Sequence, residues 1–113
     1  LFFHGNADPI FSALEVVDYT KRMHDALGVA RAAEFSRTYL VPGMNHCAGG
    51  PATDAFDGLG AIESWVEKGA APARIEASGT TEMAGISRPL CAYPKMARYQ
   101  GGDEKLAASF ECR

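Results

Sequence analysis

The fold is decided by the stretch LFFHGNADP, residues 1–9, and by the segments that follow it. Its first three residues, Leu1-Phe2-Phe3, are apolar and predict the end of a buried strand. The residues from His4 to Pro9 are typical of a turn, and they include a glycine that can adopt a positive φ. Because exposed chain ends are usually polar, we expect a chain that opens inside a buried strand to be one segment of a longer protein.

A helix and a second strand follow this turn. Ser12 lies three residues before Glu15, which is the spacing of a capping box. Apolar residues then recur with a helical period up to Gly28, which is placed to end the helix. The pattern of residues 35–41 predicts a strand, which ends at the pair Pro42-Gly43. Strand, helix and strand in this order predict a βαβ unit with two parallel strands and a right-handed crossover.

The second half of the chain carries weaker signals. A second helix is expected to begin at Thr53 or Asp54, with Asp54 and Asp57 as capping residues, and to end at Gly69. Its apolar stripe consists of Phe56, Leu59, Ile62 and Val66. Short strands are expected over 74–77 and 86–90, and residues 91–113 are expected to be irregular.

These elements define an α/β fold class made of a βαβ unit, a second helix and an irregular tail. Parallel strands are normally covered on both faces, and two of them form too small a sheet to bury either face. We therefore expect the fold to be incomplete alone, and the missing strands to come from the rest of a parent chain or from another chain.

Composition excludes several classes of function. The 113 residues provide one domain, and the 47% hydrophobic and 22% charged residues are ordinary for a globular protein. Fourteen acidic against eleven basic residues give a net charge of −3, and without a basic stripe no nucleic-acid partner is expected. No apolar run approaches the roughly 20 residues that span a bilayer, so no membrane partner is expected either.

Two residues with catalytic chemistry each follow a predicted strand. Asp8 lies in the turn after the first strand, and His46 lies in the glycine-rich loop after the second. Because the carboxyl ends of parallel strands meet at one edge of a sheet, their side chains can touch there. A carboxylate that holds Nδ1 of an imidazole leaves Nε2 free to act as a general base near neutral pH. The acid precedes the base, which is the order found in α/β-hydrolases.

Structural interpretations of these residues stay open beside the catalytic one. Asp8 could be only a turn residue, and His46 could have only a structural role. His4 is expected to support the site or to bond the backbone. A metal site of His4, Asp8, His46 and Cys47 is a further alternative, but it lacks the short ligand-pair spacings of zinc sites.

Several motifs resemble the carboxyl-terminal part of the tannase and feruloyl esterase family. They are His46-Cys47-Ala48-Gly49-Gly50-Pro51, which is the most specific, Trp65-Val66-Glu67-x-Gly69-x-x-Pro72, Arg88-Pro89-Leu90-Cys91-x-Tyr93-Pro94 and Ala108-Ser109-Phe110-x-Cys112. The resemblance covers essentially the whole chain. It implies that residues 1–113 are the C-terminal segment of an α/β-hydrolase catalytic domain, without the nucleophile elbow and the lid domain.

The resemblance also implies an activity, namely hydrolysis of carboxylic esters of phenolic acids through a Ser-Asp-His triad. Asp8 matches the acid of the family and His46 its general base. None of the six serines lies in a G-x-S-x-G motif, so we expect the nucleophile outside this chain and no activity from this chain alone. The chemistry implies no cofactor, and the family pattern allows a structural calcium only in the absent lid domain.

Two other functions stay open. The chain could belong to another serine hydrolase of the same fold, such as a peptidase or a lactone hydrolase. It could also be a non-catalytic binding or assembly domain that pairs its strands with a partner.

The three cysteines are also interpreted through the resemblance. It implies a disulfide between Cys91 and Cys112, and a bond between Cys47 and a cysteine outside this chain, next to the nucleophile. Three free thiols in a reducing compartment are the alternative. If the disulfides form, the parent protein is expected to be secreted or periplasmic.

Overall fold

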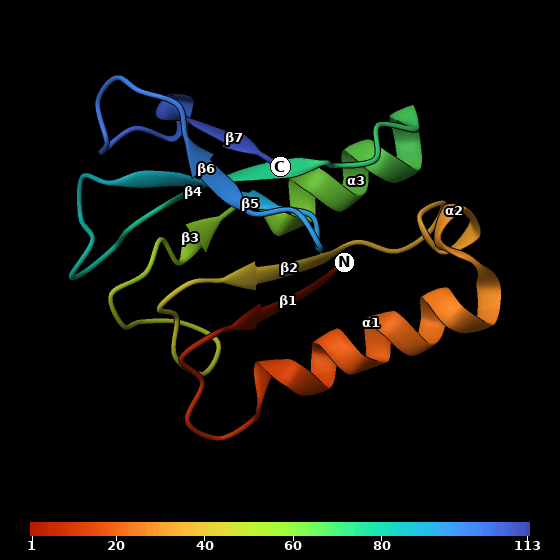
Figure 1. The fold of residues 1–113 in the computed structure, drawn as a ribbon. Coiled ribbons are helices and arrows are strands. Elements are labelled where there is room, and N and C mark those ends of the chain that lie inside the picture. Colours follow the sequence, from red (N-terminus) through yellow and green to blue (C-terminus); the bar gives the residue numbers. More distant parts are fainter.

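The computed structural model describes residues 1–113 as three small sheets with helices around them (Figure 1). The elements are, in chain order, β1 (Phe2–Gly5), α1 (Ala13–Leu27), α2 (Val29–Ala32), β2 (Thr38–Val41), β3 (Ala55–Phe56), α3 (Gly58–Lys68), β4 (Arg74–Ser78), β5 (Ser87–Cys91), β6 (Ala97–Tyr99), a 3₁₀ turn (Ala107–Ser109) and β7 (Phe110–Cys112). Helices and strands are mixed in one small domain, as predicted, with one parallel strand pair and two antiparallel sheets.

β1 and β2 form the predicted parallel pair, in which Gly5 lies opposite Val41. α1 connects them and runs along one side of the pair (Figure 1). It is fastened to β2 by a buried hydrogen bond of 2.9 Å between the hydroxyls of Thr20 and Thr38. The second strand begins three residues later than predicted, because α2 and a turn occupy the residues before it.

The ends of α1 follow the local sequence. The Ser12 hydroxyl accepts a hydrogen bond from the backbone N–H of Leu14, and Gly28 ends the helix with φ 82°. The Glu15 side chain makes no hydrogen bond back to the Ser12 backbone, so only half of the predicted capping box forms. One cap bond and one glycine are enough to set the bounds of this helix.

α3 begins later than predicted. Its N-cap is Asp57, whose carboxylate accepts a hydrogen bond of 2.7 Å from Gly60 N–H, and Gly69 ends it in the left-handed region. The predicted starts at Thr53 and Asp54 were wrong, because Phe56 joins the short strand β3, which pairs with β4. Strand pairing therefore competes successfully with helix formation for the residues before Asp57.

The core lies between β2 and the antiparallel sheet β3–β4–β5. Its buried residues come from β2, the loop after it, β4 and β5: Tyr39, Val41, Met44, Ala52, Ile75, Ala77 and Leu90. The Tyr39 hydroxyl crosses the core to donate a hydrogen bond to the carbonyl of Pro72. Since Met44 is part of this core, the loop after β2 is fixed at its beginning.

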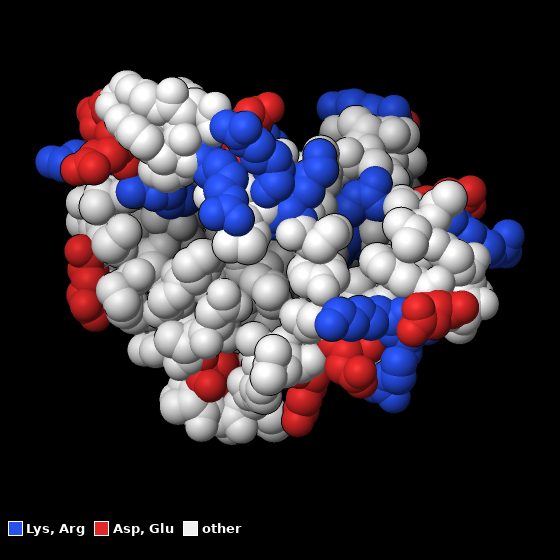
Figure 2. Space-filling model, viewed as in Figure 1, with Lys and Arg blue, Asp and Glu red and all other residues white.

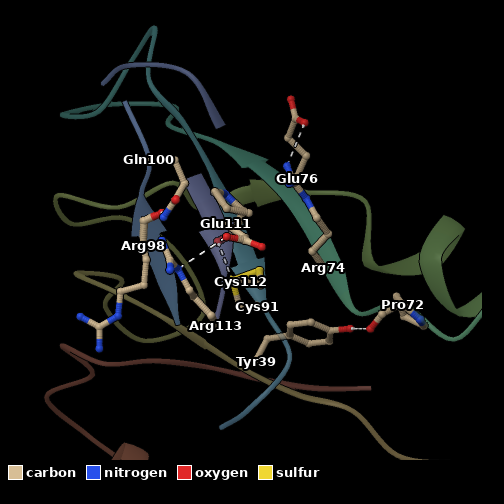
Figure 3. Close-up of a disulfide and its surroundings, with 11 residues drawn as sticks. Tyr39, Pro72, Arg74, Glu76, Cys91, Arg98, Gln100, Glu111, Cys112 and Arg113 are labelled. Carbon is tan, nitrogen blue, oxygen red and sulfur yellow. Dashed lines mark hydrogen bonds and ion pairs between the residues drawn. A yellow bond between two sulfur atoms is a disulfide. The ribbon is translucent and has the colours of Figure 1, made fainter. Parts of the chain in front are cut away.

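Residues 91–113 are more regular than predicted. β6 and β7 form an antiparallel pair, with Ala97 opposite Cys112. A disulfide joins Cys91 at the end of β5 to Cys112 in β7 (Figure 3). The Arg88 guanidinium lies 4.3 Å from the centre of the Phe110 ring, a contact that also holds the tail against β5. Cross-strand contacts and the disulfide, which local sequence patterns do not report, order this tail.

The strand β1 has no strand on its outer edge. The side chains of Phe2 and Phe3 remain 41% and 49% exposed, although they belong to a parallel strand.

The surface charge is distributed unevenly. Lys and Arg gather mainly over the part of the molecule where β4 to β7 lie, away from β1 and α1 (Figures 1 and 2). None of the helices combines the length and the hydrophobicity needed to cross a lipid bilayer.

Candidate active site

The loops after β1 and β2 are joined at the carboxyl edge of the parallel pair. Asn6 N–H donates to the carbonyl of Val41, and Ala7 N–H donates to the carbonyl of Met44. The N···O distance is 3.0 Å in both bonds. A Cβ atom on Gly5 would lie only 2.2 Å from the Met44 carbonyl oxygen, so glycine is required for this close approach. The two loops that carry Asp8 and His46 therefore lie against each other.

Asp8 forms a turn and faces His46 at the same time. Its Oδ1 accepts hydrogen bonds from the backbone N–H groups of Ile10 and Phe11, at 2.8 and 3.1 Å. Its Oδ2 lies 2.8 Å from Nδ1 of His46. The carboxylate is almost completely buried, with 2% of its side chain exposed. The turn interpretation and the site interpretation of this residue are thus both compatible with its contacts.

His46 presents one ring nitrogen to Asp8 and the other to the surroundings. An ionised carboxylate can only accept, so Nδ1 carries the proton of the bond to Asp8 and Nε2 is the acceptor nitrogen. Nε2 makes no hydrogen bond within the chain, and 42% of the side chain is exposed. The ring of Phe11 lies against the imidazole, with ring centres 5.4 Å apart. Such an imidazole can take a proton from a group that approaches Nε2.

His4 is a second imidazole at the same carboxylate. Its Nε2 donates a hydrogen bond to the carbonyl of Phe11 over 3.1 Å, which confirms the expected backbone bond. The same nitrogen lies 3.5 Å from Oδ2 of Asp8. His4 therefore stabilises the turn from Asp8 to Phe11 by binding the carbonyl of Phe11.

The pKa of Asp8 is lowered by its partners. Burial alone would raise it, but hydrogen bonds from His46 and from the N–H groups of Ile10 and Phe11 outweigh burial and bring the pKa from 3.8 to about 2. The carboxylate is therefore ionised at every pH at which an imidazole can act as a base.

Asp54 was expected to cap the second helix, and the structure gives it another role. Its Oδ2 accepts a hydrogen bond of 2.9 Å from Gly49 N–H, in the loop of His46. Its Oδ1 accepts from the hydroxyl and from the N–H of Thr80, at 2.8 and 3.3 Å. These bonds, led by that from Gly49, lower the pKa of Asp54. The sequence alone does not indicate this contact, because an acid just before a helix is equally typical of a cap.

Cys47 follows His46 with φ 66°, and its thiol is exposed and unpaired in this chain. The predicted bond to a cysteine outside the chain stays a prediction. The disulfide between Cys91 and Cys112 is present. His4, Asp8, His46 and Cys47 are not arranged as metal ligands, because both imidazoles point at one carboxylate oxygen and no group of three or more His, Cys, Asp or Glu side chains could hold an ion.

The fold is shared with solved esterases. The crystal structure of feruloyl esterase B from Aspergillus oryzae superposes with a TM-score of 0.82 and 29% sequence identity, over 98% of this chain and 26% of that enzyme. The fold of this chain thus matches part of a solved esterase.

The chain belongs to the tannase and feruloyl esterase family, whose pattern matches residues 1–113. It is 50% identical over 117 residues to mono(2-hydroxyethyl) terephthalate hydrolase of Piscinibacter sakaiensis and 37% identical over 120 residues to a probable feruloyl esterase of Arthroderma benhamiae. The alignments cover 99% of this chain but only 19% and 22% of the two relatives, so the chain spans about a fifth of their length.

Proposed function

We propose that residues 1–113 supply the acid and the general base of a serine-type carboxylic ester hydrolase that acts on esters of aromatic acids. The observation that carries this proposal is the 2.8 Å contact between Oδ2 of Asp8 and Nδ1 of His46 at the ends of two adjacent parallel strands. The proposal further treats the chain as the C-terminal part of an α/β-hydrolase domain. The 19% and 22% coverage of the curated relatives supports a longer parent protein, and the position within it rests on the motifs that resemble the carboxyl-terminal part of the family.

In the proposed mechanism, His46 transfers protons and Asp8 stays ionised. A serine hydroxyl from outside this chain attacks the ester carbonyl, and Nε2 of His46 takes its proton. The tetrahedral intermediate breaks its bond to the alcohol, which leaves with that proton. Water then attacks the acyl-enzyme, gives a proton to Nε2 and releases the acid, and the proton returns to the serine. Asp8 holds the ring and stabilises its charged form in each step.

The surroundings of His46 support an aromatic acyl group. Phe11 lies against the imidazole, and Ile10 and Phe11 expose 64% and 54% of their surface. The surface over the loops after β1 and β2 carries few charged groups (Figure 2). An aromatic ring can pack on such a surface beside the reacting carbonyl. Relatives of this chain are named for terephthalate monoester and feruloyl ester hydrolysis.

The disulfide supports a proposal about the cellular compartment of the protein. Disulfides persist in oxidising environments, so the bond between Cys91 and Cys112 supports a secreted or periplasmic protein.

The test is hydrolysis by the complete protein that carries this chain. Methyl ferulate, methyl gallate and mono(2-hydroxyethyl) terephthalate are offered beside an aliphatic methyl ester and a peptide, with His46→Ala as the inactive control. We expect turnover of at least one aromatic ester and its loss in the variant. Turnover that persists in His46→Ala, or cleavage of the peptide in place of the esters, would contradict the proposal.

A further inference from the structure

Within this chain, backbone hydrogen bonds hold the segment that carries His46 only at its two ends. The backbone N–H groups of His46, Cys47 and Ala48 make no hydrogen bond within the chain, and all three residues are exposed. A hydrogen bond of 3.0 Å from Asn45 N–H to the carbonyl of Gly49 joins the two ends of the segment. The position of the imidazole therefore depends on how the residues at the two ends of this short segment are fixed.

The near end is fixed by the core. Met44 is 1% exposed, and its carbonyl accepts the hydrogen bond from Ala7 N–H. The far end, Gly49, is held at two points: its N–H donates to Oδ2 of Asp54 at 2.9 Å, and its carbonyl accepts from Asn45 N–H. Gly49 has φ 76°, and a Cβ atom built on it would meet nothing within 4 Å.

Asp54 is itself fixed by a residue just after a strand of the sheet β3–β4–β5, which is separate from the parallel pair β1–β2. Thr80 follows β4 and donates both its hydroxyl and its N–H to Oδ1, at 2.8 and 3.3 Å. The carboxylate thus accepts three hydrogen bonds, with its two oxygens facing two different loops. A carboxylate can accept all three of them, whereas the nitrogen of an amide would face a donor.

We propose that Asp54 is a positioning residue for His46, which fixes the far end of the loop through Gly49 and so keeps Nδ1 of the imidazole on Asp8. The kinetic consequence of this inference rests on the proposed ester hydrolase function, whereas its structural consequence does not. Asp54 lies outside the reacting atoms and acts through the loop alone. Displacements of about 1 Å in an active site can cost about 100-fold in rate.

The test compares Asp54→Ala with Asp57→Ala in the complete protein. Asp57 is a matched control, because its carboxylate also accepts a hydrogen bond from a glycine N–H, 2.7 Å long, but caps α3 instead of the loop. We expect Asp54→Ala to lower kcat on an aromatic ester by about 10- to 100-fold, with KM changed by less than about threefold. Asp57→Ala is expected to lower the unfolding midpoint and leave kcat within about twofold.

A second measurement reads the position of the imidazole without turnover. The Nδ1 proton of His46 bonds to Asp8, so it is expected to give an exchange-protected proton resonance in the wild type. This resonance should be lost or broadened in Asp54→Ala and kept in Asp57→Ala. Asp54→Asn, which retains one acceptor oxygen, should show a smaller loss in both measurements. If Asp54→Ala does not fold, the comparison between Asp54→Asn and Asp57→Ala decides in its place.

The outcomes separate this inference from the proposed function. A wild-type protein that hydrolyses no ester overturns the proposed function, and the resonance then decides the inference: its loss in the Asp54 variants supports it, and its persistence overturns it. In an active protein, folded Asp54 variants that keep both the resonance and kcat within about twofold would overturn the inference.

Discussion

Asp8 uses both of its carboxylate oxygens, and each oxygen has its own partners. Oδ1 accepts from two backbone N–H groups, which fixes the turn, and Oδ2 faces His46. A carboxylate held in this way is oriented before any substrate arrives. The imidazole is therefore held with Nε2 free, which is the orientation that a general base needs.

Replacing Asp8 tests this interpretation at the residue scale. Asp8→Asn in the complete protein removes the negative charge beside the imidazole, and an amide favours the wrong tautomer. We expect kcat for an aromatic ester to fall by about 10⁴-fold, as it does when the corresponding acid of a serine protease is replaced. Asp25→Asn, on the exposed face of α1, is the charge-matched control and should keep wild-type kcat. A fall of less than tenfold in Asp8→Asn would show that Asp8 is not the orienting acid.

The lowered pKa of Asp8 predicts a pH dependence of stability. The folded pKa of about 2 lies below the reference value of 3.8, so the ionised carboxylate stabilises the folded state. This contribution is complete above about pH 4 and is lost as the pH falls through about 2. The difference in Tm between the wild type and Asp8→Asn should therefore shrink between pH 5 and pH 2, in calorimetric scans of the complete protein. A difference that stays constant over this range would contradict the assignment of the shift to Asp8.

The candidate residues Asp8 and His46 could be selected from the sequence, because each follows a strand-like segment in a βαβ pattern. Asp54 could not be selected, since its partners Gly49 and Thr80 are brought together by the pairing of β3 with β4. The contact of Phe11 with the imidazole was missed for a similar reason. Local sequence patterns predict which residues follow a strand, but they do not predict which loops contact each other in the folded chain.

At the scale of elements, the parallel pair of β1 and β2 brings together the two loops that carry Asp8 and His46. The close approach depends on Gly5, where a Cβ atom would lie 2.2 and 2.4 Å from the carbonyl oxygens of Met44 and Asn45. Both of these atoms belong to the backbone of the loop that carries His46. Any side chain at this position must therefore displace the loop or the strand.

Gly5→Ala is expected to damage both stability and activity. Overpacking of this kind costs about 1–3 kcal/mol in the free energy of unfolding, measured by urea denaturation of the complete protein. The loop shift should also lower kcat by at least about tenfold. Gly58→Ala is the control, because its Cβ would meet only the Phe56 ring at 3.6 Å. Equal stability and activity in the two variants would show that the approach of the loops at Gly5 does not matter.

The elements themselves were predicted with uneven success. α1 and the parallel pair followed from apolar periodicity and end signals at Ser12 and Gly28, since these act locally. The start of α3 was wrong, because Phe56 is used in a strand that forms only with β4. The disulfide of the tail was expected from the resemblance, but the strands β6 and β7 were missed, because their pairing with each other and the contact of Arg88 with Phe110 order a segment with little pattern of its own.

At the scale of the whole molecule, one half is closed and the other is open. The core between β2 and β4–β5 is buried, and the disulfide holds the tail beside it (Figure 3). β1, in contrast, has a free edge and half-exposed phenylalanines. An edge strand presents unpaired N–H and C=O groups, so this edge is where further strands of an α/β-hydrolase domain would pair under the proposed function.

The disulfide contributes to stability by constraining the unfolded chain. Cys91 and Cys112 are separated by 21 positions, and closing a loop of this size contributes about 3 kcal/mol on the chain-entropy model. The double variant Cys91→Ala/Cys112→Ala should therefore unfold at lower urea concentration in the complete protein. Non-reducing peptide mapping of the wild type should recover the two cysteines in one linked peptide. Free thiols at both positions would contradict this pairing.

The most direct test of the account is a double-mutant cycle on kcat in the complete protein, with Asp8→Asn, His46→Ala and the double variant. If Asp8 acts only by orienting and stabilising His46, the double variant should be no slower than His46→Ala alone, because groups that act as a unit are strongly non-additive. Losses that multiply in the double variant would show that the two residues act independently, and would contradict the acid–base pair on which the proposed function depends.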